Sequence, residues 1–171
     1  MKDTAAVVTF KGKPLTLLGK QPKVGDTAPD AVMLAGDLTE VRISDSRGKV
    51  CVIASVPSLD TPVCDAEVRR FNRQAADLGG DVAILTISMD LPFAQARWCG
   101  AAGIDAVRTL SDHRNAAFGA AYGVLIKELR LLARAVFVVD REGMIRHVQI
   151  VGELAKEPDY DAVLNAVRRL G

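Results

Sequence analysis

Residues 50–64 read VCVIASVPSLDTPVC and join two kinds of local pattern. Val50–Val56 is a nearly unbroken run of apolar and β-branched residues, which is typical of a strand buried on both faces of a sheet. A short polar segment follows and ends in Thr61 and Pro62, which are favoured residues for the N-cap and the first position of an α-helix. The stretch therefore predicts a buried strand that leads into a helix, with Cys64 in the first helical turn.

Strand and helix patterns alternate on both sides of this stretch. Helices are expected at 62–78, 91–102, 115–122 and 158–170, and strands at 7–10, 15–18, 32–34, 40–43, 50–56, 82–88, 106–110, 135–139 and 144–150. Helices between strands imply parallel pairing, and the terminal hairpin 135–150 adds antiparallel edges. We expect one α/β domain over residues 1–171, with a mixed central sheet flanked by helices and an N-terminal hairpin within residues 1–18. This pattern is compatible with a thioredoxin-like fold but is not specific to it.

Composition excludes several classes of protein. The 171 residues are 49% hydrophobic and 25% charged, with a net charge of +1, so the chain has no broad electrostatic footprint for nucleic acid or an anionic membrane. Its longest apolar runs are far too short to span a bilayer. The N-terminal sequence MKDTAAVVTFKGK has no apolar core of signal-peptide length, so we expect a cytoplasmic protein in a reducing compartment.

The cysteines do not form a disulfide framework or a zinc motif. Cys51, Cys64 and Cys99 are odd in number and widely spaced, and no pair has the C-x-x-C spacing of zinc sites or thioredoxin-type redox motifs. His113 and His147 have no cysteine near them in the sequence, so we expect no metal and no cofactor. Cys51 lies inside the apolar strand, where a free cysteine is usually an inert core residue.

Cys64 has the position of a reactive thiol. It is the third residue of the expected helix, where unpaired amides and the helix dipole favour the thiolate. The Thr61 hydroxyl is expected to lie close to it. Asp65 and Glu67 act against the thiolate, because they are acids in the same helical turns. A reactive Cys64 therefore needs a cation from elsewhere in the fold.

Arg134 is the candidate for that cation. It opens the predicted strand 135–139, and an arginine there can reach the end of the sheet. Arg69 and Arg70 are local competitors, which we expect on solvated faces of the helix. Position alone leaves open whether Cys64 is reactive or a buried, inert residue.

The pattern Pro57-x-x-x-Thr61-x-x-Cys64 resembles the active-site motif of peroxiredoxins. Five segments extend this likeness over essentially the whole chain: PSLDTPVCDAEVRRFN, SMDLPFAQARWCGAAG, LSDHRNAAFGAAYGV, LLARAVFVVD and EPDYDAVL. Together they resemble the bacterial thiol peroxidases, a branch of the atypical two-cysteine peroxiredoxins. The cysteine in the second segment points to this branch, whereas the first motif alone names only the superfamily.

The resemblance implies a role for each matching residue. Cys64 matches the peroxidatic cysteine, Thr61 the threonine that bonds the thiolate and the peroxide, and Pro57 the proline that shields the pocket. Arg134 matches the arginine that activates the thiol, and Cys99 the resolving cysteine of the same chain. The resemblance also implies a thioredoxin-like fold, a homodimer, recycling by thioredoxin, and reduction of hydrogen peroxide and organic hydroperoxides in antioxidant defence.

A Cys64–Cys99 disulfide would join two helices 35 residues apart in the sequence. Its Cα atoms must approach within about 7 Å, so we expect local unfolding of the first turn at Cys64, of the helix end at Cys99, or of both. Gly100 and Gly103 lower the cost of that unfolding.

Three other functions remain open from the residues alone. One is a thioredoxin-like binding or scaffold protein with inert cysteines, in which Cys64 would stay a thiol at neutral pH. Another is a dithiol oxidoreductase, which the missing C-x-x-C motif disfavours. The last is a metal-dependent hydrolase, for which two isolated histidines supply too few ligands.

Overall fold

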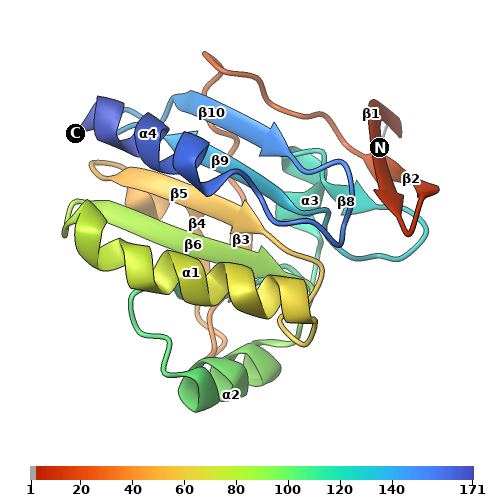
Figure 1. Ribbon diagram of the computed structural model, residues 1–171, viewed down its shortest axis with the longest axis horizontal. Coiled ribbons are helices and arrows are strands. Elements are labelled where there is room, and N and C mark those ends of the chain that lie inside the picture. The colour runs from red at the N-terminus through yellow and green to blue at the C-terminus, as the bar shows by residue number, and fades with distance from the viewer. Residues whose placement is uncertain (1–2) are drawn as a thin grey trace.

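The computed structural model describes residues 3–171, and within them a mixed seven-stranded sheet forms the centre of the molecule (Figure 1). Its strands are β3 (Val32–Leu34), β4 (Glu40–Arg42), β5 (Val50–Ser55), β6 (Val82–Ser88), β7 (Arg108–Ser111), β9 (Ala135–Val139) and β10 (Ile145–Ile150). They lie in the order β10-β9-β5-β6-β7-β3-β4. A separate three-stranded sheet contains β1 (Asp3–Phe10), β2 (Lys13–Leu18) and β8 (Leu125–Ile126).

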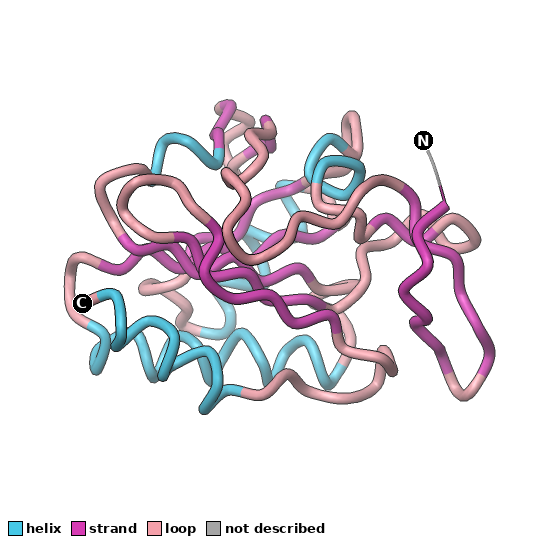
Figure 2. The backbone as a smooth tube through the Cα atoms, turned by 90° about the horizontal axis from the view of Figure 1, so that it is seen from above, coloured by secondary structure: helices cyan, strands magenta, loops and turns pink. Residues whose placement is uncertain are grey.

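Helices lie on both faces of the large sheet (Figures 1 and 2). They are α1 (Pro62–Leu78), α2 (Pro92–Ala102), α3 (Ala117–Ala121), α4 (Tyr160–Leu170) and the 3-10 helix η1 (Ile43–Ser46). Helices α1 and α4 pack on one face through a shared apolar cluster, and α3 packs on the other. None of these helices is both long and apolar enough to cross a membrane.

Strand β5 explains why both faces are covered. Val50, Val52 and Ala54 belong to the core under α1 and α4, whereas Cys51 and Ile53 belong to the core under α3. The strand pairs in parallel with β6 and antiparallel with β9, so both its edges and both its faces are buried. The predicted strand buried on both faces is confirmed, and its end delivers the chain to the start of α1.

The expected α/β architecture, thioredoxin-like with a mixed sheet between helices, is confirmed. Helix α1 and strand β6 have the predicted bounds, whereas β8 and η1 were not predicted. Of the expected N-terminal hairpin, residues 1–2 lie outside the described part of the chain, and β1 and β2 pair antiparallel around residues 11–12.

The start of α2 differs from the expectation. The helix was expected to begin at residue 91, but Leu91 is the N-cap residue and Pro92 the first helical residue. The Asp90 carboxylate accepts hydrogen bonds from the Ser58 hydroxyl at 2.7 Å and the Leu59 amide at 2.8 Å. These bonds tie the loop before α2 to the loop before α1. Because both carboxylate oxygens of Asp90 accept from the loop before α1, they do not cap α2.

Candidate active site

The start of α1 places Cys64 in the first helical turn, as predicted. Thr61 is the N-cap with extended backbone, and Pro62 is the first helical residue. The Thr61 hydroxyl donates to the Ser58 carbonyl at 2.8 Å, within the turn that leads into the helix, and does not cap it. Its expected position close to Cys64 stays a prediction, and in this structure the local turn supplies its acceptor.

Arg134 is the cation that reaches Cys64. Its Nη2 donates to the Cys64 Sγ at 3.3 Å, and its Nη1 donates to Glu67 Oε2 at 2.7 Å. Nε and Nη2 also donate to the Leu154 carbonyl at 3.1 and 2.7 Å. Arg134 is only 1% exposed, so these partners hold a buried cation against the sulfur of a fully buried cysteine.

The two local arginines point elsewhere. Arg69 forms an ion pair with Asp65, with Nε and Oδ2 2.8 Å apart. Arg70 lies over the Tyr160 ring, 4.0 Å from its centroid. Both arginines are therefore occupied by other groups, and Arg134 is the guanidinium that contacts the thiol.

Glu67 is the functional candidate that the sequence interpretation missed. It was counted as a charge against the thiolate, but it is fully buried and anchors Arg134. Burial raises the pKa of Glu67 to about 7, although Arg134 acts in the opposite direction. The available signal was its spacing, because a residue three positions after Cys64 lies on the same face of the helix.

Cys64 and Glu67 also act on the pKa of their shared partner, Arg134. Burial by itself would lower the pKa of Arg134, but its interactions with Cys64 and Glu67 outweigh burial, and the pKa is raised. Arg134 therefore remains a cation in its buried position. A buried, permanently charged donor is the kind of group that stabilises negative charge on an oxygen or sulfur without reorganising.

A groove of about 300 Å³ leads to this cluster. Most of its lining is apolar, and Arg134 and Thr61 contribute polar groups. The lining residues are Phe10, Pro57, Thr61, Pro62, Val63, Leu129, Leu131, Arg134, Leu154 and Ala155. The structure thus brings Pro57, Thr61 and Arg134 to one groove, and Arg134 connects that groove to the Cys64 sulfur.

Cys99 does not lie in this groove. It is a half-buried residue of α2, and its Sγ is 3.4 Å from the Thr109 hydroxyl on β7. All three cysteines are free thiols, so the structure represents the reduced chain. Cys64 and Cys99 thus contact different groups, and the expected disulfide stays a prediction that needs local rearrangement.

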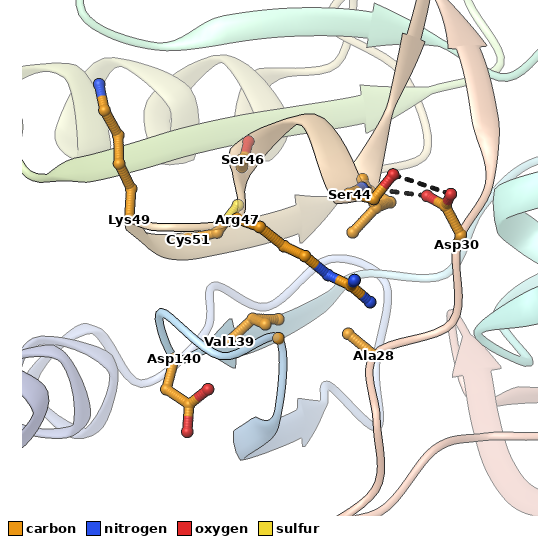
Figure 3. A pocket seen from close by; sticks show the side chains of 11 residues that line it. Ala28, Asp30, Ser44, Ser46, Arg47, Lys49, Cys51, Val139 and Asp140 are labelled. Carbon is orange, nitrogen blue, oxygen red and sulfur yellow. Dashed lines mark hydrogen bonds between the residues drawn. The ribbon is translucent and has the colours of Figure 1, made fainter.

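Cys51 lies beside a different, small cavity (Figure 3). The cavity beside it has a volume of only about 20 Å³, and Arg47, Lys49 and Asp140 also line it. Burial raises the pKa of Cys51 to about 12. Residues 3–171 also contain no cluster of three or more His, Cys, Asp or Glu side chains that could hold a metal ion.

The chain matches a known protein family. The Redoxin family model matches residues 23–164, which is most of the chain and includes all the candidate residues. The chain belongs to the Redoxin family. This redoxin is 59% identical over 162 residues to the thiol peroxidase of Oceanobacillus iheyensis, covering 95% of this chain and 98% of that protein. It is 56% identical over 165 residues to the thiol peroxidase of Bacillus subtilis strain 168, with 96% and 98% covered.

Solved structures agree with this result. The peroxiredoxin-like protein from Aquifex aeolicus superposes with a TM-score of 0.92 at 45% identity, covering 98% of each chain. The predicted likeness to bacterial thiol peroxidases is therefore confirmed, and this redoxin is a thiol-dependent peroxidase of the peroxiredoxin type. The inert scaffold, the dithiol oxidoreductase and the metal-dependent hydrolase are disfavoured accordingly.

Proposed function

We propose that the protein reduces hydrogen peroxide and organic hydroperoxides through Cys64, that Cys99 of the same chain resolves the product, and that thioredoxin restores both thiols. One observation carries this proposal: the buried Arg134 guanidinium contacts the Cys64 sulfur at 3.3 Å beside an open groove. A thiolate nucleophile needs such a cation, and its position at a helix N-terminus adds favourable backbone dipoles.

The first step is a nucleophilic displacement on oxygen. The Cys64 thiolate attacks one peroxide oxygen, the O–O bond breaks, and the sulfur becomes a sulfenic acid while the peroxide is reduced to water or an alcohol. Negative charge develops on the leaving oxygen, and we assign Arg134, Thr61 and the first amides of α1 to stabilise it. For Thr61 this requires the hydroxyl to turn away from the Ser58 carbonyl. Pro57 shields this part of the groove from water.

The second step forms a disulfide. The Cys99 sulfur attacks the Cys64 sulfenic acid, an S–S bond forms, and the sulfenic oxygen leaves as water. Thioredoxin then reduces the disulfide by thiol–disulfide exchange. This recycling requires a reducing compartment, so the proposal includes a cytoplasmic location. It also includes the homodimer that the family resemblance implies and a single domain over residues 1–171.

The groove supports organic hydroperoxides as substrates beside hydrogen peroxide. Phe10, Leu129 and Leu131 supply apolar surface at its rim, and two of them are exposed large side chains in the absence of a ligand. An alkyl chain bound there would remove this surface from water while its peroxide group faces Arg134.

The test compares the unaltered protein with Cys64→Ser and Cys99→Ser in a thioredoxin-coupled peroxide assay. We expect no turnover in Cys64→Ser, because no nucleophile remains. Cys99→Ser should consume one equivalent of peroxide rapidly and then stop. Peptide mapping under non-reducing conditions should detect a Cys64–Cys99 link in the unaltered protein alone. Turnover in Cys64→Ser would refute the assigned nucleophile, and sustained turnover in Cys99→Ser would remove Cys99 from the cycle.

A further inference from the structure

One polar contact joins the two helices that carry the cysteines. The Trp98 indole Nε1 on α2 donates to Asp65 Oδ1 on α1 at 3.0 Å. Arg69 completes the group, because its Nε lies 2.8 Å from Asp65 Oδ2 and its guanidinium carbon lies 5.7 Å from the centre of the Trp98 ring. Trp98 directly precedes Cys99, and Asp65 directly follows Cys64. The contact therefore lies one residue away from each of the two reacting thiols.

This contact fixes the direction in which both thiols point. Successive residues of an α-helix are rotated by about 100° around its axis. With Asp65 turned towards α2, Cys64 faces Arg134, and with Trp98 turned towards α1, Cys99 faces Thr109 on β7. A disulfide requires both sulfurs to turn towards each other, so the helix backbone must rotate or unwind at one or both cysteines. Neither movement preserves the bond between Trp98 and Asp65.

The rest of the junction resists this movement only weakly. Of the eleven residues of α2, only Pro92 and Gln95 are buried. A groove of about 350 Å³, which Asp65 and Trp98 help to line, runs beside this contact, and the half-buried Trp98 ring packs at the edge of the core under α1 and α4. The helix ends at Gly103 in a left-handed conformation, which glycine adopts without strain. Gln95 anchors the first half of α2 through bonds to the Ser88 hydroxyl and the Leu110 carbonyl, and the charge-assisted bond of Trp98 to Asp65 ties its second half to α1.

We propose that Trp98 and Asp65, supported by Arg69, form a latch that must open before Cys99 can reach the Cys64 sulfenic acid. The inference rests on the proposed cycle and adds positioning residues to its second step. While the latch is closed, the sulfenic acid is exposed to a second peroxide, which transfers one oxygen to it, giving a sulfinic acid and water or an alcohol. The latch therefore sets how the sulfenic acid divides between disulfide and overoxidised product.

Trp98→Phe is the sharpest variant, because it removes the indole donor while keeping an aromatic ring and adding no charge near Cys64. We expect disulfide formation to become roughly tenfold faster, the effect of losing one hydrogen bond to a charged group. The first oxidation of Cys64 should stay within about twofold, because Trp98 bonds neither Cys64 nor Arg134. Both rates are measured by rapid quenching, thiol alkylation and mass mapping after addition of hydrogen peroxide.

The partition between products is the readout that a merely structural role would not move. The hydrogen peroxide concentration that overoxidises half of Cys64 during turnover should rise roughly tenfold in Trp98→Phe, because the disulfide step competes with the second oxidation. Asp65→Asn should shift it in the same direction by a smaller factor, since its amide oxygen still accepts the indole hydrogen without the charge. This second variant carries the test if Trp98→Phe does not fold.

Asn72→Ala is the matched control. Asn72 also links α1 to the segment after α2, because its Oδ1 accepts from the Ala106 amide at 2.8 Å, but it lies away from both cysteines in the sequence. We expect a much smaller change in the rate of disulfide formation. An equal acceleration in Asn72→Ala and Trp98→Phe would overturn the latch, because general loosening of α2 would then explain both results.

The single tryptophan gives an independent reading in the unaltered protein. Trp98 fluorescence should change at the same rate at which the disulfide forms. It should not change when Cys99→Ser is oxidised. Identical emission in the reduced and disulfide forms would overturn the latch. If the Cys64–Cys99 disulfide forms in the unaltered protein but Trp98→Phe forms it no faster, the latch alone fails. If the unaltered protein forms no such disulfide, the proposed cycle fails and the latch fails with it.

Discussion

Cys51 and Cys64 are almost equally buried, with exposed fractions of 3% and 0%, yet their surroundings differ in chemistry. Cys51 lies in the middle of β5, and burial raises the pKa of its thiol to about 12 against the weak opposing effect of Ser46. Cys64 lies in the first turn of α1 and accepts a hydrogen bond from Arg134. Burial alone disfavours a thiolate, whereas a bonded guanidinium and helix amides stabilise one. The partner, and not the depth of burial, distinguishes the nucleophile from the core residue.

The two cysteines also differ in what must be maintained around them. Cys51 needs only apolar neighbours, because it behaves as a small apolar side chain. Cys64 needs a buried arginine, and a buried arginine needs partners of its own, here Glu67 and the Leu154 carbonyl. Changes around Cys64 should therefore affect rate and pH dependence, whereas changes at Cys51 should affect stability alone.

Of the variants considered, Arg134→Met is expected to reduce the reactivity of Cys64 most and so to remove most of its difference from Cys51. The variant removes the cation while keeping an unbranched apolar side chain, so Cys64 would resemble Cys51 in its surroundings. We expect the second-order rate constant for Cys64 oxidation to fall by about 10²–10³, the effect of losing one positioned donor. The measurement is stopped-flow or competition kinetics with hydrogen peroxide.

Arg70→Met is the matched control for Arg134→Met. It removes a guanidinium from α1 that lies over the Tyr160 ring and makes no bond to Cys64. Its oxidation rate should remain close to that of the unaltered protein. A normal rate in Arg134→Met would mean that another group activates Cys64, and the contrast with Cys51 would then need a different explanation.

Glu67→Gln should have an intermediate effect, visible in the pH dependence of stability. The pKa of Glu67 is raised to about 7 in the folded chain, above its ordinary value of 4.5. The folded state therefore holds a proton that the unfolded state releases, so this contribution to stability is present below pH 4.5 and is lost as pH rises through about 7. Relative to Glu67→Gln, the unaltered protein should lose roughly 2 kcal/mol between about pH 5 and about pH 8.

Urea unfolding of the reduced proteins at both pH values measures this difference. Glu40→Gln is the control, because Glu40 forms an exposed pair with Arg114 and should show no such relative change. Parallel pH dependence in Glu67→Gln and in the unaltered protein would show that Glu67 does not hold a proton in the folded chain, and that the site around Cys64 is a fully charged cluster.

The sequence predicts the local half of this site and, of the contacts between segments, only the one that Arg134 makes with Cys64. The bounds of α1 follow from Thr61, Pro62 and the apolar stripe, because N-cap preference and helical periodicity are local properties. Glu67 could not be matched with Arg134, which is 67 residues away, because that pairing depends on how β9 and α1 are placed.

The latch and the short elements were missed for the same kind of reason. Trp98 and Asp65 are 33 residues apart, and no periodicity connects them. Strand β8 has only two residues, and η1 has four, so neither offers a pattern longer than the uncertainty at an element's ends. Cys51, by contrast, was assigned to the core from its strand alone, because an apolar β-branched run reports burial directly.

Cys51→Ser should have the smallest effect on catalysis and thereby sharpens the comparison. It places a hydroxyl in an apolar core between β6 and β9, so we expect a loss of about 1–2 kcal/mol in the free energy of unfolding. Peroxide turnover should stay within about twofold, because Cys51 has no contact with Arg134 or the groove. Denaturant unfolding and the thioredoxin-coupled assay on the same preparation separate the two quantities. A folded Cys51→Ser protein with strongly reduced turnover would show that Cys51 exchanges disulfides with Cys64 or Cys99, and its burial would then have to open during the cycle.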